Sequence, residues 1–124
     1  MAGVKNLLTL ADISAANPGH SSNAHLYAVL TDGNRLVLLD DRGWTSGFGG
    51  IDAQTPDEVT QTAKHVVGPD GTVPGESQAE VDRWYWMTLV GQLDDAGISI
   101  SAADLSALPH EVEISERLLK RLKV

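Results

Sequence analysis

Apolar residues dominate two neighbouring stretches in the first half of the chain. Residues 25–31 and 35–40 are rich in Leu, Val and Tyr, which favours β-strands. Residues 32–34 (Asp-Gly-Asn) lie between them and suit a tight hairpin turn. Both faces of this hairpin (25–40) carry apolar side chains, which predicts a sheet covered on both sides, or nearly so. A third strand is predicted through residues 44–48.

A helix start lies near the middle of the chain. Thr55 can act as the N-cap, Pro56 suits the first helical position, and Glu58 completes a capping box. Apolar residues then keep helical spacing as far as Gly68 and Pro69, which stop a helix. The sequence therefore predicts a helix between Pro56 and Gly68.

The longest predicted helix follows a second capping box. Ser77 and Glu80 have the spacing of that motif, and Gly97 suits the left-handed position that ends a helix. These signals predict a helix over residues 78–96, which spans roughly 28 Å at ~1.5 Å per residue. Because that length crosses a small domain, we expect it to be the central helix.

The N-terminal segment can be interpreted in two ways. Residues 9–12 (Thr-Leu-Ala-Asp) have the form of a capping box and predict a short helix that stops at Pro18. Residues 7–10 could instead form an edge strand.

The C-terminal segment carries three short signals. Ser101 can cap a short helix that Pro109 ends, and residues 112–114 alternate as in a short strand. A last helix is expected from Ser115. Its inward-facing residues would be Leu118, Leu119 and Leu122.

Together these elements predict a single α+β domain over residues 1–124. We expect a two- or three-stranded antiparallel sheet packed against helices. The chain has 124 residues, 42% of them hydrophobic and 21% charged, which is ordinary for a folded protein. A chain of this length buries about two-thirds of its surface, enough for a core without metals or disulfides.

The charge of the chain is strongly acidic. Nine basic residues face seventeen acidic ones, so the net charge is −8, and four of the basic residues lie among the last eight. A negative body repels phosphate backbones, so nucleic acid is not expected as a partner, whereas a basic protein would be attracted. The simpler explanation, that the charge only keeps the protein in solution, stays open.

The sequence offers little for catalysis. It has no cysteine, which excludes disulfides and thiolate metal sites, and it lacks the motifs of phosphate loops, zinc proteases and serine hydrolases. The first ten residues do not resemble a signal peptide, and no apolar run reaches the ~18 residues of a membrane span. We therefore expect a cytoplasmic protein with no catalytic residues, no cofactor and no metal.

Histidines are the remaining candidates for a metal or acid–base site. The chain has four of them: His20, His25, His65 and His110. Two could meet in space with Asp40 or Asp41, but their spacing does not favour this. Asp40-Asp41 and Asp94-Asp95 are paired acids. Adjacent side chains on a strand or helix point apart, which disfavours joint catalysis.

The predicted long helix has an apolar side outside its core face. On a helical wheel the core face carries Val81, Tyr85, Trp86, Leu89, Val90 and Leu93. Trp84 and Met87 fall on the other side, with Gly91 between them. Either a second element of the chain packs closely at Gly91, or Trp84 and Met87 form an exposed patch that anchors a partner. These two residues are secondary interface candidates.

Residues 40–58 combine acids with aromatic residues. Acids can steer a basic partner and aromatic side chains can anchor it, so this segment is the first candidate for an interface. The candidate partner-binding residues are Asp40, Asp41, Trp44, Phe48, Asp52, Asp57 and Glu58. The alternative is that Trp44 and Phe48 fold back over the sheet as a hydrophobic lid.

Residues 27–43 (YAVLTDGNRLVLLDDRG), the Trp44 that follows and the acidic, helical second half give the chain a recognisable form. In this form it resembles the immunity proteins of bacterial polymorphic and contact-dependent toxin systems. Such proteins are small, acidic, cysteine-poor cytosolic domains that block a cognate toxin, often a basic nuclease. The resemblance implies inhibition by occlusion of the toxin's active surface, and it carries over no functional residue.

The first function expected is therefore that of a protein-binding inhibitor of the immunity type. The second is a subunit or adaptor, including a homo-oligomer that uses Trp84 and Met87 in its own interface. The third is a small enzyme or ligand-binding domain that uses the histidines.

Overall fold

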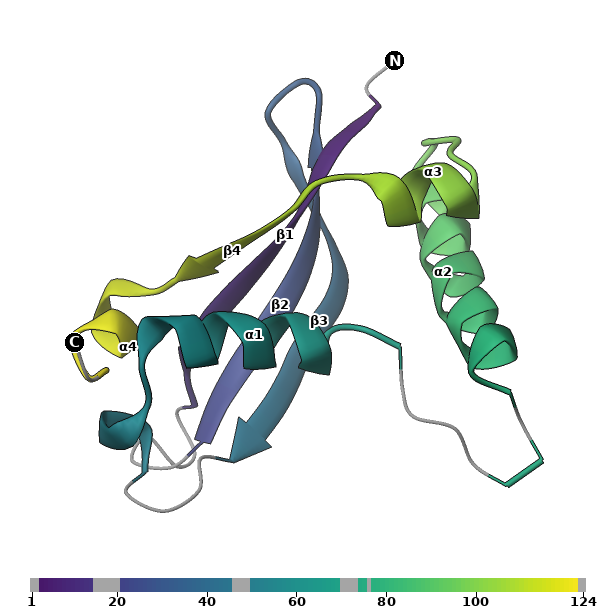
Figure 1. Cartoon of the computed structure of the whole chain (residues 1–124). Helices are drawn as coiled ribbons and strands as arrows, with labels where there is room; N and C mark the ends of the chain where they lie inside the picture. Colours follow the sequence, from purple (N-terminus) through teal and green to yellow (C-terminus); the bar gives the residue numbers. More distant parts are fainter. Residues whose placement is uncertain (1–2, 15–20, 46–49, 70–73, 76, 123–124) are drawn as a thin grey trace.

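The computed structural model describes residues 3–14, 21–45, 50–69, 74–75 and 77–122 (Figure 1). This part of the chain forms a sheet of the strands β1 (Val4–Ile13), β2 (Ser21–Leu30), β3 (Arg35–Thr45) and β4 (His110–Ile114). The strand order is β3-β2-β1-β4. Neighbours among the first three strands are antiparallel, whereas β4 is parallel to β1. The α+β prediction is confirmed, but the expected two- or three-stranded antiparallel sheet is wrong, because the sheet is four-stranded and mixed.

The N-terminal segment is an interior strand. β1 pairs with β2 on one side and with β4 on the other, so neither the predicted helix nor the alternative edge strand is correct. Thr9 is fully buried, and its hydroxyl lies 2.5 Å from His110 Nε2 on β4. Leu7, Leu8 and Ala11 are buried in this position, and this tertiary packing outweighs the local helix signal.

The predicted hairpin of β2 and β3 is confirmed. At its turn the N–H of Leu30 donates to the carbonyl of Asn34 at 2.8 Å, and Gly33 has a φ of 90°. Both strands are longer than predicted. Trp44 belongs to the end of β3 and not to the separate strand predicted over residues 44–48. Phe48 lies outside the described residues.

The sheet has a core face and an outer face, because side chains alternate along each strand. In β2, Ala24, Leu26 and Ala28 are buried in the core, whereas Tyr27 is half-buried. Val37, the partner of Tyr27 on β3, is 48% exposed. The buried residues of the helices form one cluster with the core face. The prediction that both faces are covered is therefore wrong for this part of the outer face.

Four α-helices complete the described fold: α1 (Pro56–Val66), α2 (Gln78–Asp95), α3 (Ala102–Ala107) and α4 (Glu116–Leu119), with a 3₁₀ turn η1 (Ile51–Ala53) before them. Their predicted starts are confirmed. At α1, the N–H of Glu58 donates to the Thr55 hydroxyl at 3.2 Å, and both halves of the capping box are present. Gly97 follows α2 with a φ of 84°, as expected for a helix end.

The last helix differs from the prediction in one residue. Leu118 and Leu122 are buried in the core, as expected. Leu119, predicted to face inward, is 45% exposed. The described helix is only four residues long, so it presents a narrow inner face.

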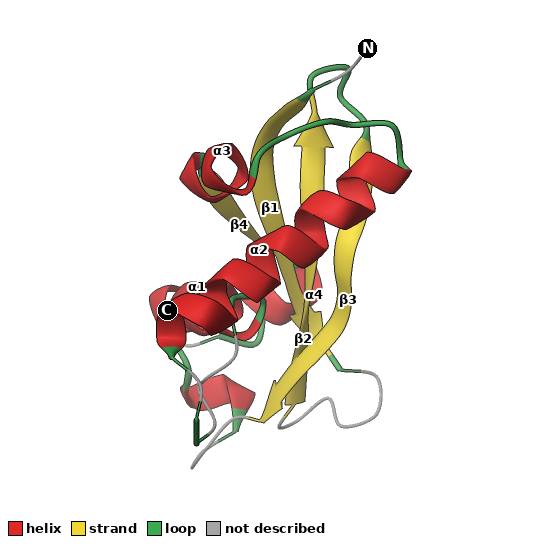
Figure 2. Cartoon of the chain, turned by 90° about the vertical axis from the view of Figure 1, so that its right-hand side faces the viewer, coloured by secondary structure: helices red, strands yellow, loops and turns green. Residues whose placement is uncertain are grey.

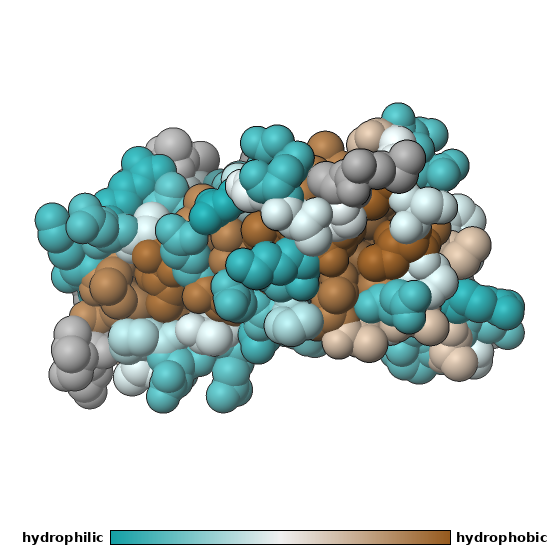
Figure 3. Space-filling view, turned by 90° about the horizontal axis from the view of Figure 1, so that it is seen from above, coloured by the Kyte–Doolittle hydropathy of each residue, from teal (hydrophilic) through white to brown (hydrophobic). Residues whose placement is uncertain are grey.

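The helices differ in how they cover the sheet. α1 crosses the sheet, whereas α2 lies at one side of the molecule (Figure 1). The prediction that α2 is the central helix is therefore wrong. Viewed from that side, α2 runs obliquely in front of the sheet (Figure 2). Seen from above, hydrophobic residues form a band with hydrophilic residues on both sides (Figure 3). Among the described helices, none is long and apolar enough to cross a membrane.

Candidate functional site

α2 packs on the rest of the chain along one face only. Leu89 and Leu93 are buried in the core, and the hydroxyl of Tyr85 donates to the backbone carbonyl of Val67 at the end of α1. The predicted core face of this helix is thus the face that packs. The opposite side, which we call the α2 outer face, consists of exposed residues: Glu80, Arg83, Trp84, Met87, Thr88 and Gly91.

Large apolar side chains are exposed on the α2 outer face. Trp84 is 75% exposed and Met87 is 55% exposed. A helix surface that faces water normally carries polar residues there. An open hollow of about 650 Å³ lies on this face, lined by Glu80, Arg83, Trp84, Met87 and Thr88.

A narrower groove of about 290 Å³ adjoins the first hollow between α2 and β3. Trp84 and Thr88 line both spaces, and Leu39 and Arg42 of β3 are among the residues that line only the groove. The exposed indole of Trp84 therefore lies between the hollow on α2 and the groove next to β3.

Gly91 is not covered by another element of the described chain. A Cβ atom added at Gly91 would meet nothing within 4 Å. The prediction that a second element of the chain packs closely there is therefore wrong, and Trp84 and Met87 are exposed. Their role as an interface stays a prediction.

The charges along the α2 outer face are unevenly placed. Glu80 and Arg83 lie near its beginning, while Asp94 and Asp95 are exposed at the C-terminal end of α2. The last turn of the helix contains no basic residue. Because the helix dipole is negative at this end, two carboxylates there are unfavourable without a cation.

Of the acids predicted within residues 40–58, those whose side chains the structure describes do not form one site. Asp40 is exposed on the outer face of the sheet, where its carboxylate lies 2.6 Å from His25 Nδ1. Asp57 and Glu58 are exposed in the first turn of α1, which packs on the core face, and Glu58 belongs to the capping box there. The side chains of Asp41 and Asp52 lie outside what the structure describes, as does Phe48.

Trp44 is packed against the core and not displayed on the surface. It is half-buried, and its Nε1 is buried without a hydrogen-bond partner in the described part of the chain. Ser22, its partner on β2, has a buried hydroxyl in the same condition. For Trp44, the alternative of an aromatic residue folded onto the sheet matches the structure.

The described histidines do not converge. His25 lies on the outer face of the sheet, His65 is exposed on α1, and His110 bonds to Thr9 in the core. Burial, and then the positive charge of Lys64, lowers the pKa of His110. The described residues contain no group of three or more side chains that could hold a metal ion, and His20 lies outside them.

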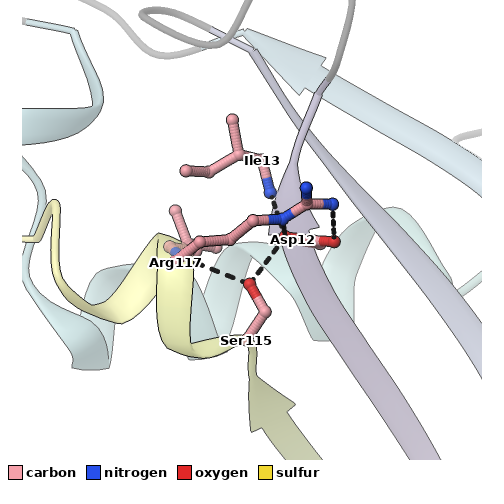
Figure 4. Close-up of polar contacts among 5 residues, drawn as sticks. Asp12, Ile13, Ser115 and Arg117 are labelled. Atoms are coloured by element: carbon pink, nitrogen blue, oxygen red, sulfur yellow. Dashed lines mark hydrogen bonds and ion pairs between the residues drawn. The ribbon is translucent and has the colours of Figure 1, made fainter.

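One polar cluster was not predicted from the sequence. Arg117 at the start of α4 donates from Nε to Asp12 Oδ1 of β1 at 2.7 Å, and a second bond joins its Nη2 to Oδ2 (Figure 4). The Ser115 hydroxyl donates to the same Asp12 oxygen at 2.6 Å. The bonds to Arg117 hold the pKa of Asp12 at about 2. These residues lie at opposite ends of the chain, so no local signal could have indicated the pairing.

Comparison with protein families, with curated proteins and with solved structures gave no match for this chain.

Proposed function

We propose that this chain is a protein-binding module that uses the α2 outer face. The observation that carries the proposal is the exposure of Trp84 and Met87 beside an open hollow. A single exposed apolar residue is ordinary. Two large ones that border one hollow on a helix face are typical of a partner site, and Trp is the residue type most enriched among binding hot spots.

A photo-crosslinking amino acid placed at position 87 in cells tests this proposal. We expect a covalent adduct with another protein chain from position 87. The matched control is position 37, because Val37 is also an exposed apolar residue but lies on the outer face of the sheet. Equal adducts from both positions, or none from position 87, would contradict the proposal.

A second candidate is an inhibitor of the immunity type that occludes a basic toxin. The net charge of −8 and the exposure of Asp40, Asp57 and Glu58 support it. Acids spread over a surface accelerate association with a basic protein even when they form no single cluster. Charge reversal at Asp40 and Asp57 should therefore slow the association, and an unchanged rate would contradict this candidate.

A further inference from the structure

We propose that the partner of the α2 outer face is a second copy of this chain, with the two α2 helices packed side by side in opposite directions. This inference rests on the proposed function and names the partner. Three features support it: the glycine on this face, the order of charges along the helix, and the position of α2 in the fold.

The first feature is Gly91, which lies on the exposed side of α2 about one turn before the helix ends. Glycine lowers the stability of a helix relative to alanine, so its place inside a helix needs an explanation. Within the described chain nothing lies close enough to provide one. A second helix that crosses at Gly91 would use the missing side chain to approach closely.

The second feature is the spacing of Arg83 and Asp94. They are eleven residues apart, about three helical turns at ~3.6 residues per turn, so they lie on the same flank of α2. In an antiparallel pair with two-fold symmetry the same flanks face each other. Arg83 of each copy then lies against Asp94 of the other. In a parallel two-fold pair opposite flanks face each other, so Arg83 and Asp94 would not come together.

The same pairing supplies the charge that the end of α2 lacks. Asp94 and Asp95 oppose the helix dipole, and the last turn of α2 has no basic residue. Arg83 is exposed, and the described residues give it no ion pair within its own chain. The second copy thus provides a cation for the C-terminal end of the helix, whereas the N-terminal end already carries Glu80 in its first turn.

The apolar side chains fit the same register. When Arg83 of the first copy lies opposite Asp94 of the second, Gly91 of the second copy lies at a level between Trp84 and Met87 of the first. Two large side chains then fill the space at a residue that has none, as knobs do in the holes of packed helices. Each copy contributes this arrangement once, as a two-fold interface requires.

The third feature is access. α2 lies at one side of the molecule (Figure 1), and the described residues of its outer face are exposed, so a second copy can reach them. One pair of helices buries less than the ~1,200 Å² of a standard interface, and both copies are negatively charged. We therefore expect a weak dimer, with a dissociation constant on the order of 10 µM or higher.

Sedimentation equilibrium of the whole chain, from ~1 µM to several hundred micromolar, tests the pairing. Arg83→Glu and Asp94→Lys should each weaken dimerisation at least tenfold. An equimolar mixture of the two variants should dimerise again, because each altered residue then faces its complement in the other chain. Glu111→Lys, which changes an exposed acid on β4 by the same charge, should not weaken the dimer.

A steric variant gives an independent measurement. Gly91→Leu should abolish dimerisation while circular dichroism shows the same fold and no loss of thermal stability. A mixture of the two charge variants that stays monomeric, or an Asp94→Lys variant that dimerises as the parent does, would overturn the inference. In that case a crosslink from position 87 to a different protein would still support the proposed function, whereas no crosslink would contradict both.

Discussion

Asp12 links the stability of this fold to pH. The hydrogen bonds from Arg117 lower its pKa from an ordinary value of 3.8 to about 2. The folded state therefore favours the carboxylate, and this contribution is fully present above pH 3.8 and is lost as the pH falls through about 2. Because Asp12 is on β1 and Arg117 on α4, the bond holds the last helix against the sheet.

Asp12→Asn should lower the free energy of unfolding at neutral pH by about 1 kcal/mol. The value is small because the Arg117 side chain is 68% exposed, so water screens the pair. The difference from the parent should shrink as the pH falls from about 4 to about 2, measured by urea denaturation. Glu111→Gln is the control, and a difference that does not change with pH would contradict the role of Asp12.

At the level of elements, the sequence predicted what short-range chemistry determines. The starts of α1, α2 and α3 each follow from an N-cap residue whose side chain accepts a hydrogen bond from the backbone N–H three residues later. The hairpin follows from Gly33 and its neighbours. β1 could not be predicted in this way. The strands that pair with β1 are formed by residues 21–30 and 110–114. Because both are distant in sequence, the local pattern of β1 does not decide between helix and strand.

The candidate site, like the fold, was predictable only where local sequence determines it. The helical wheel separated Trp84 and Met87 from the core face of α2, but it could not say whether another element covers them. Acids close in sequence were expected to act together within residues 40–58. The structure separates Asp40 from Asp57, because a strand and the helix after it place them on opposite sides of the sheet.

Gly91→Ala should stabilise the monomer. Alanine favours a helix interior by about 1 kcal/mol over glycine, and the added Cβ meets nothing within 4 Å. The free energy of unfolding should rise by about that amount in urea denaturation at ~1 µM, where a weak dimer is dissociated. An unchanged or lower value would mean that part of the chain already packs on Gly91.

At the scale of the whole molecule, the net charge of −8 acts on any partner. It attracts a basic protein from a distance and repels a second copy of the same chain. Close ion pairs such as Arg83 with Asp94 operate at short range, where salt screens them less than it screens separated charges. The two candidate partners therefore differ in how their binding responds to salt.

Raising the ionic strength from ~0.01 M to ~0.15 M shortens the Debye length from about 30 Å to about 8 Å. Self-association through α2 should become stronger over this range, because the repulsion between two negative bodies falls while the helix contact remains. Binding to a basic toxin should become weaker, because the attraction is lost. Sedimentation equilibrium at both ionic strengths measures the first effect. A dimer that dissociates as salt rises would show that attraction between local charges such as Arg83 and Asp94, and not the packing of Trp84 and Met87, holds the copies together.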